Sequence, residues 1–287
     1  MIAIMKKELR AYFNSIIGWL FIAFFLAFVG LYVFLYNFLN QSAFIGYALS
    51  SVSLIFALLV PMVTMRIIAE ENKQRTDQLL LTSPVSIGRI VLGKYLALEI
   101  LFALAMAFIC IYPVIFSFFG PVNMKMSYVA VLGFFLVGSA YLAIGLFISS
   151  LTESQAFAAV MTFVVVLITC LADGIAELLP STAKAAYATY TFLWLVVAVW
   201  LWRMLKNSSV AIAIFAVGEC ALTAVYLLKP TMLEGTIPTV FGTVSVMKLY
   251  DETITGVFNL TMPVYYVSIA FVFCFLTYQN IRKRRYC

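Results

Sequence analysis

Long apolar runs alternate with short polar breaks along almost the whole chain. Measured against the roughly 20 apolar residues that a membrane-spanning helix needs, they predict eight spans near residues 17–39, 45–66, 95–119, 127–150, 155–173, 187–204, 209–228 and 263–281. The pattern is weakest at 187–228, where a re-entrant hairpin between six true spans is the alternative. Arg203 and Lys206 favour a crossing, because two cations held at mid-membrane would be costly. We therefore expect a polytopic, all-α helical bundle with about eight transmembrane helices.

Composition agrees with this membrane pattern. Of the 287 residues, 65% are hydrophobic and only 10% are charged, whereas soluble domains carry about 25% charged residues. No polar stretch is long enough to build a separate soluble domain, so we expect residues 1–287 to form a single transmembrane domain. The first apolar run is too long for a signal peptide and lacks a cleavage site after it, so we expect it to remain as an anchor.

The basic residues are divided unevenly between the two ends of the expected spans. With the N-terminus inside, the inner breaks hold 14 of the 18 Lys and Arg residues and the outer breaks hold the other 4. The positive-inside rule then places both termini in the cytosol of a multi-pass membrane protein, which we expect in a bacterial plasma membrane. The net charge of +6 is thus a topology signal, and it predicts no nucleic-acid partner.

Residues 1–16 have the pattern of an amphipathic helix that lies on the membrane surface. Lys6, Lys7 and Arg10 share one side, where they suit anionic lipid headgroups, so membrane lipid is an expected partner. The alternative is an ordinary basic flank to the first span. The opposite side carries apolar residues at three- and four-residue steps: Ile2, Met5, Leu9, Tyr12, Phe13 and Ile16.

The longest charged break, residues 67–94, lies between the second and third spans on the expected cytosolic side. Its sequence predicts a helix from Ala69 to Leu81, with acidic residues in the first turn, where the helix dipole favours anions. Ser83 and Pro84 then end this helix, and Ser86 can cap a second helix that runs into the third span.

Three consecutive leucines, Leu79, Leu80 and Leu81, follow Asp77 in this break. Exposed apolar patches usually mark a contact with a partner. The leucines therefore predict an apolar knob, flanked by charges, that fits a groove on a cytosolic protein. The alternative is that they pack back onto the protein's own membrane face.

Four blocks of the sequence resemble, in the same order, the ABC-2 type transporter permeases, and particularly the branch that includes the gliding-motility permeases. The blocks are KKELRAYFNSIIGWLF (6–21), MRIIAEENKQRTDQLLLTSPVSIGRIVLGKYLA (65–97), YLAIGLFISSLTESQAFAA (141–159) and FNLTMPVYYVSIAFVFCFLTYQNIRKRR (258–285). Together they cover 96 of the 287 residues, about a third of the chain. The resemblance implies a permease subunit, typically of an exporter, that dimerises with itself or with a second permease and is driven by separate cytosolic ATPase subunits.

The same resemblance implies a role for several segments of the chain. Residues 1–16 become the elbow helix, 67–94 the loop with the coupling helix, and 229–262 an outer segment of short amphipathic helices. The hairpin at 187–228 is extra to the usual six spans of the family. The residues implied in contact with the ATPase are Glu70, Glu71, Arg75, Asp77, Leu79, Leu80, Leu81, Ser83, Pro84 and Glu153.

Catalytic chemistry is not indicated on this chain. Histidine is absent and the five cysteines form no CxxC pair, which removes the commonest general base and metal ligand and the usual redox motif. No GxxxxGK[ST] phosphate loop is present, so ATP and magnesium are expected on the partner ATPase and no cofactor or metal on this chain.

Glu219, midway along the seventh span, is a candidate intramembrane site because an ionised group there is costly. It could bind a proton, a cation or a polar substrate, or form a protonated carboxyl bonded to a neighbouring helix. The first possibility would suit an ion-coupled carrier, which is the alternative function, and a membrane-embedded enzyme using Glu219 and Asp173 is a weaker one. No internal repeat and no HExxH or GxSxG motif supports them.

Other residues within the spans have structural interpretations. Glu99, one turn into the third span, is expected to bond to Lys94 or to water at the lipid surface. Pro61 and Pro113 are expected to kink their helices. Small residues in the fourth span predict close helix approach: Gly138, Ala143, Gly145 and Ser149.

Overall fold

The computed structural model describes residues 1–76, 85–205, 233–254 and 260–286, together with residues 215, 216, 218–220, 222–224, 226 and 227. Within these residues the regular structure is entirely helical. The chain divides into two compact units, Met1–Cys170 with Val246–Cys287 (unit 1) and Leu171–Ser245 (unit 2).

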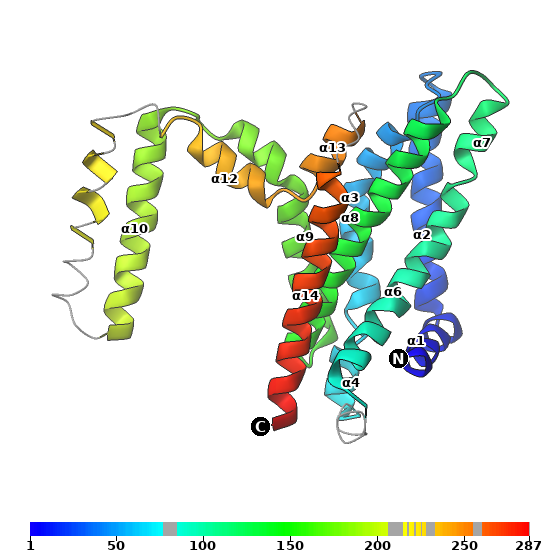
Figure 1. Cartoon of the computed structure of the whole chain (residues 1–287), viewed down its shortest axis with the longest axis horizontal. Coiled ribbons are helices and arrows are strands. Elements are labelled where there is room, and N and C mark those ends of the chain that lie inside the picture. The colour runs from blue at the N-terminus through cyan, green and yellow to red at the C-terminus, as the bar shows by residue number, and fades with distance from the viewer. Residues whose placement is uncertain are drawn as a thin grey trace. The chain divides into compact units, whose positions relative to one another are not determined.

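Unit 1 is a helical bundle (Figure 1). Its elements are α1 (Ile2–Asn14), α2 (Ile16–Val33), the π-helix η1 (Phe34–Phe38), α3 (Gly46–Thr64), α4 (Ala69–Gln74), α6 (Ile87–Ile109), α7 (Tyr112–Ser117), α8 (Met124–Leu151), the first part of α9 (Gln155–Leu178), α13 (Lys248–Ile254) and α14 (Thr261–Tyr286).

Six helices among the described residues are long and apolar enough to cross a membrane: Ile16–Phe38, Gly46–Gln74, Ile87–Ser117, Met124–Leu151, Gln155–Leu178 and Thr261–Arg284. They coincide with six of the eight predicted spans. The predicted span at 187–204 falls on α10 (Ala183–Leu205) of unit 2. The span predicted at 209–228 lies largely outside the described residues, so the total of eight stays a prediction.

The centre of unit 1 is filled by aromatic side chains. Phe25 of α2, Phe56 of α3, Phe102 of α6 and Phe134 of α8 are fully buried, and their ring centroids lie 5.0 to 6.4 Å apart. A Cβ atom on Gly138 of α8 would lie 2.2 Å from the Phe102 ring. The absence of that atom therefore lets α6 approach α8, as the small residues of the fourth span predicted.

Unit 2 contains α10, α12 (Thr236–Val244) and helical residues between positions 215 and 227. Ala183 and Ala186 of α10 pack with Leu233 and Ile237 in a small core. The short helices α12 and α13 fall within the predicted outer segment. However, Tyr250 of α13 is fully buried, so α13 packs into the bundle of unit 1 and does not simply lie on its surface.

The helix predicted over 69–81 ends much earlier, at Gln74. Arg75 adopts the left-handed conformation (φ 56°, ψ 20°). Its N–H donates to the carbonyl of Asn72 and the N–H of Thr76 donates to the carbonyl of Glu71, at 3.3 and 3.1 Å, which is the Schellman arrangement that terminates helices. Residues 77–84 lie outside the described residues.

The next helix, α6, begins at Ile87 directly after Ser86, as predicted, although the Ser86 side chain makes no capping bond. Pro113 stands where α6 gives way to α7, because proline has no N–H for the carbonyl four residues earlier. Pro61, in contrast, lies within α3, which continues to Thr64.

Candidate functional site at the α4 end of unit 1

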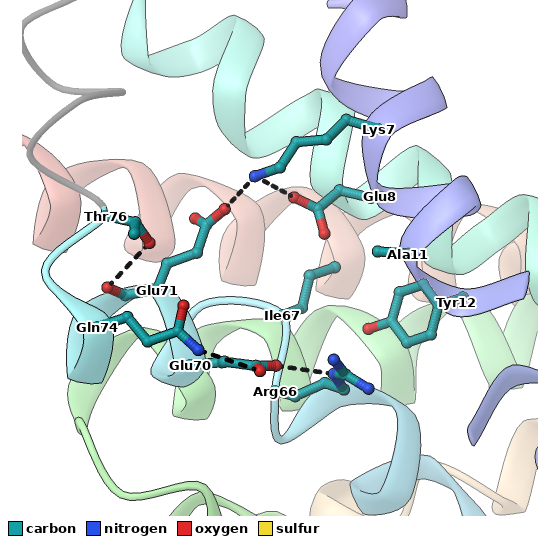
Figure 2. A pocket seen from close by; sticks show the side chains of 10 residues that line it. All are labelled: Lys7, Glu8, Ala11, Tyr12, Arg66, Ile67, Glu70, Glu71, Gln74 and Thr76. Carbon is teal, nitrogen blue, oxygen red and sulfur yellow. Dashed lines mark hydrogen bonds and ion pairs between the residues drawn. The ribbon is translucent and has the colours of Figure 1, made fainter. Parts of the chain in front are cut away.

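One end of unit 1 brings together α1, α4, the beginning of α6 and the C-terminal part of α14 (Figure 1). We call it the α4 end. A pocket of about 590 Å³ opens there between α1 and α4 (Figure 2). It is lined by Lys7, Glu8, Ala11, Tyr12, Arg66, Ile67, Glu70, Glu71, Gln74 and Thr76.

Lys94, about two turns into α6, is the centre of the bonding at this end. Its side chain is only 2% exposed. The ammonium donates to Oε1 of Glu8 on α1, to Oε2 of Glu71 on α4 and to the carbonyl of Ile67, each at 2.8 Å. An ammonium has three N–H donors, so this buried cation is fully satisfied and ties three segments together.

Lys7 completes a cluster of four alternating charges. Its Nζ atom lies 2.6 Å from Oε1 of Glu71 and 3.6 Å from Oε1 of Glu8. Partial burial disfavours the charged ammonium, but the hydrogen bond and the charge of Glu71, with Glu8 adding to them, raise the pKa of Lys7 above its ordinary value of 10.5. Lys7, Glu8, Glu71 and Lys94, the four-charge cluster, therefore sum to zero formal charge.

A second ion pair lines the same pocket. Nε of Arg66 donates to Oε2 of Glu70 at 2.8 Å, and Figure 2 shows this pair beside Gln74, with the Lys7–Glu71 pair across the pocket. Nη1 of Arg66 also reaches Oγ of Ser15, between α1 and α2, at 3.4 Å. The pair therefore adds to the connection between α4 and the N-terminal helices.

The end of α8 holds the start of α4. Oγ of Ser149 accepts from the N–H groups of Ile68 and Ala69 at 3.3 and 3.1 Å and donates to the carbonyl of Met65 at 3.2 Å. These N–H groups belong to the first turn of α4, which has no carbonyl partners of its own within the helix. A side chain from another helix thus acts as the cap.

The turn that follows α8 is bonded to its neighbours as well. Nδ2 of Asn72, on α4, donates to the carbonyl of Thr152 at 3.3 Å. Nδ2 of Asn280, on α14, donates to the carbonyl of Ser150 at 2.7 Å. α4 and the turn after α8, which lie about 80 residues apart in sequence, therefore form one continuous surface, and both hold residues predicted to contact the ATPase.

A family model described as ABC-2 family transporter protein matches residues 34–217, more than half of the chain. The chain belongs to the ABC-2 transporter family. It is thus a multi-pass membrane permease of an ABC transporter, a family that associates with an ABC ATPase. The match includes all of α10, so the region that we expected to be foreign to the family lies largely within its model. No curated protein matches the chain.

In this ABC-2 permease the residues implied in ATPase contact have different surroundings. Arg75 and Glu153 are exposed on the surface formed by α4 and the turn after α8. Glu70 is partly buried beside Arg66. Both carboxylate oxygens of Glu71 are bonded to lysines of the permease itself, so any ATPase contact of Glu71 stays a prediction that would compete with these bonds. The residues outside the described part of the chain are Asp77, Leu79, Leu80, Leu81, Ser83 and Pro84.

The expected bond between Glu99 and Lys94 is not formed. Oε2 of Glu99 instead accepts from Oγ of Ser139 on α8 at 2.9 Å, while Lys94 bonds to α1 and α4. Five positions on an α-helix differ by about 140° around its axis, so the two side chains face different neighbours.

Glu219 of unit 2 bonds to α10. Tyr187 and Thr191 both donate to its Oε1 atom, at 2.5 and 3.1 Å, and Oε2 is buried without a hydrogen-bond partner among the described residues. This geometry agrees with the second of the two interpretations offered above, a carboxyl group bonded across to a neighbouring helix.

The sequence interpretation missed the four-charge cluster, although two signals were present. Glu8 is the only acid in an otherwise basic amphipathic segment, and Lys94 is a cation close to the start of an apolar span. A charge that enters an apolar environment needs a partner of opposite sign. Each of these residues therefore indicated that a counter-charge had to come from elsewhere in the chain.

Proposed function

We propose that this permease is the membrane subunit of an exporter of the gliding-motility-like branch. In this proposal both termini are cytosolic, the permease pairs with a second permease, and a separate ATPase docks on the α4 end. The observation that carries the proposal is the continuous surface of α4 and the turn after α8. It exposes Lys73, Arg75 and Glu153 and lies at the end that also carries the basic N-terminal helix.

The bonds of α4 support a mechanism for coupling. α4 is tied to α1 by Lys7 and Glu71, to α6 by Lys94 and to α8 by Ser149. Coupling between distant sites requires a contiguous physical network. A displacement imposed on α4 by ATP-driven closure of the ATPase would pass along these bonds into three helices of the bundle.

The ion-coupled carrier is the rival function, and the described residues give it little support. Both hydrogen bonds to Glu219 come from α10 and end on the same carboxylate oxygen. This arrangement holds the carboxyl group within unit 2. It does not by itself create a site with several groups that converge on an ion.

The test is to purify the tagged full-length chain with its ATPase. The variant replaces Leu79, Leu80 and Leu81 with serine, and the control is Lys125→Glu, which changes an exposed charge just inside α8. We expect the triple variant to lose ATPase recruitment while its membrane insertion is unchanged, and the control to retain both.

Retained recruitment in the triple variant would mean that the leucines pack inward. If the purified transporter contains no ATPase and its transport does not respond to ATP, the proposed function is wrong. In that case, loss of the transport in the Glu219→Gln variant would support the ion-coupled carrier.

A further inference from the structure

The pocket between α1 and α4 presents charges of both signs to one opening. The cations Lys7 and Arg66 and the carboxylates Glu70 and Glu71 line it together, and Figure 2 shows them as two ion pairs with Ile67 between them. Its volume of about 590 Å³ falls within the range of about 300 to 1,000 Å³ that is usual for small-ligand sites.

Both members of the Arg66–Glu70 pair retain hydrogen-bonding capacity. A guanidinium has five N–H donors, and Arg66 has bonds through Nε to Glu70 and through Nη1, at a long 3.4 Å, to Ser15. Oε1 of Glu70 accepts from Gln74, also at 3.4 Å. The two side chains are 24% and 29% exposed, so a ligand can reach them.

The position of the pocket indicates what such a ligand is. Exposed apolar side chains lie at the start of α1 and at the start of α2: Ile2 is 60% exposed, Ile16 is 78% and Trp19 is 60%. In a membrane protein these side chains belong at lipid level, and tryptophan is enriched where the headgroups begin. The charged pocket therefore lies at the depth of the lipid headgroups.

We propose that this pocket binds the zwitterionic headgroup of an aminophospholipid, of the phosphatidylethanolamine class. The lipid phosphate bonds to Lys7 and Arg66, since guanidinium and ammonium groups are the usual phosphate donors. The primary ammonium of the headgroup donates to Glu70, whose Oε1 atom holds only the long bond from Gln74. The site goes beyond the proposed function, because binding of the lipid requires neither the ATPase nor transport.

The charges that line the pocket predict which lipid headgroup it selects. A phosphatidylcholine headgroup keeps both charges, but its quaternary nitrogen has no N–H to donate to a carboxylate. A phosphatidylglycerol headgroup keeps the phosphate but has no cation. A pocket built as we describe therefore prefers phosphatidylethanolamine over both, whereas a merely basic membrane surface prefers the anionic lipid.

The experiment measures lipid retention by native mass spectrometry of the full-length permease, released from nanodiscs that contain equal parts of the three lipids. The variant is Arg66→Gln with Glu70→Gln, which removes one cation and one anion and leaves the four-charge cluster untouched. The matched control is Lys73→Gln, because Lys73 is an exposed cation of α4 that does not line the pocket.

We expect one retained phosphatidylethanolamine per chain in the wild type and the control, and a loss of about tenfold in the double variant, as removal of charge-assisted bonds implies. Equal retention of the three lipids, preference for phosphatidylglycerol, or unchanged retention in the double variant would each overturn the proposal. Lys7→Gln provides a second variant with the same expected direction if the double variant does not fold. Competition by soluble phosphoethanolamine would show that the headgroup alone is recognised.

Discussion

Replacement of Lys94 by methionine tests the four-charge cluster directly. The change keeps most of the side-chain volume and removes the ammonium that bonds to Glu8, Glu71 and the carbonyl of Ile67. Two carboxylates that are 9% and 15% exposed then lose their most buried partner. The expected result is a marked loss of folding free energy, because these acids remain away from water.

The size of the loss in folding free energy follows from how deeply each lysine is buried. Removal of one partner from a buried ion pair costs about 3–5 kcal/mol, and we expect the lower end because Lys7 still contacts both acids. Lys7→Met removes the same charge from the same cluster, but the Lys7 side chain is 57% exposed. Exposed ion pairs contribute about 0–1 kcal/mol. The two lysines should therefore differ by about 2 kcal/mol or more.

The assay is reversible unfolding of the full-length chain in mixed micelles, followed by helical circular dichroism. The Glu8→Gln, Lys94→Met double variant completes the comparison. Since the two residues are in contact, we expect its cost to be smaller than the sum of the single costs by about 1–3 kcal/mol. Equal effects of Lys94→Met and Lys7→Met, or strict additivity in the double variant, would refute the assignment of Lys94 as the buried centre.

Three further substitutions test the packing and the ends of α4. Gly138→Ala should destabilise the bundle by about 1–3 kcal/mol in the same unfolding assay, because its methyl group would overlap the Phe102 ring. The control is Gly88→Ala, which should be tolerated because there is open space at the Cβ position. Ser149→Ala should leave the first N–H groups of α4 without their acceptor and cost about 1–3 kcal/mol, with faster amide hydrogen exchange confined to the start of α4. Arg75→Gly should stabilise the chain by up to about 1 kcal/mol, because glycine adopts the left-handed conformation without the Cβ penalty. A lower melting temperature of this variant would contradict the assignment of Arg75 as the residue that ends α4.

The spans could be predicted from the sequence because lipid imposes a length that apolar runs must satisfy. The six spanning-capable helices of the structure begin and end within a few residues of predicted runs, apart from extensions at the α4 end. There, Ile87 starts α6 eight residues before the predicted third span. Apolarity alone cannot locate such an extension, because the charge of Lys94 within it is satisfied by residues of other helices and not by water.

The arrangement of the α4 end could not be predicted, because it depends on partners that are distant in the chain. Glu8 and Lys94 are 86 residues apart, and Lys7 and Glu71 are 64 apart. Local propensity likewise favours a helix that continues past Gln74. The left-handed conformation of Arg75 ends it instead, and the bond from Asn72 to Thr152 fixes the last turn of α4 against α8.

The four-charge cluster also constrains how the α4 end can move. Apolar contacts could slide by part of a turn at little cost, but each carboxylate and ammonium of the cluster bonds at 2.6 to 2.8 Å to a partner on another helix. A shift of α4 relative to α6 would pull the Glu71 carboxylate away from the buried Lys94 ammonium, which is costly because both groups lie away from water. A force applied to α4 is therefore more easily accommodated by moving α1 and the start of α6 with it. If an ATPase docks on this surface, the elbow helix and the third span should move together with the coupling helix as one body.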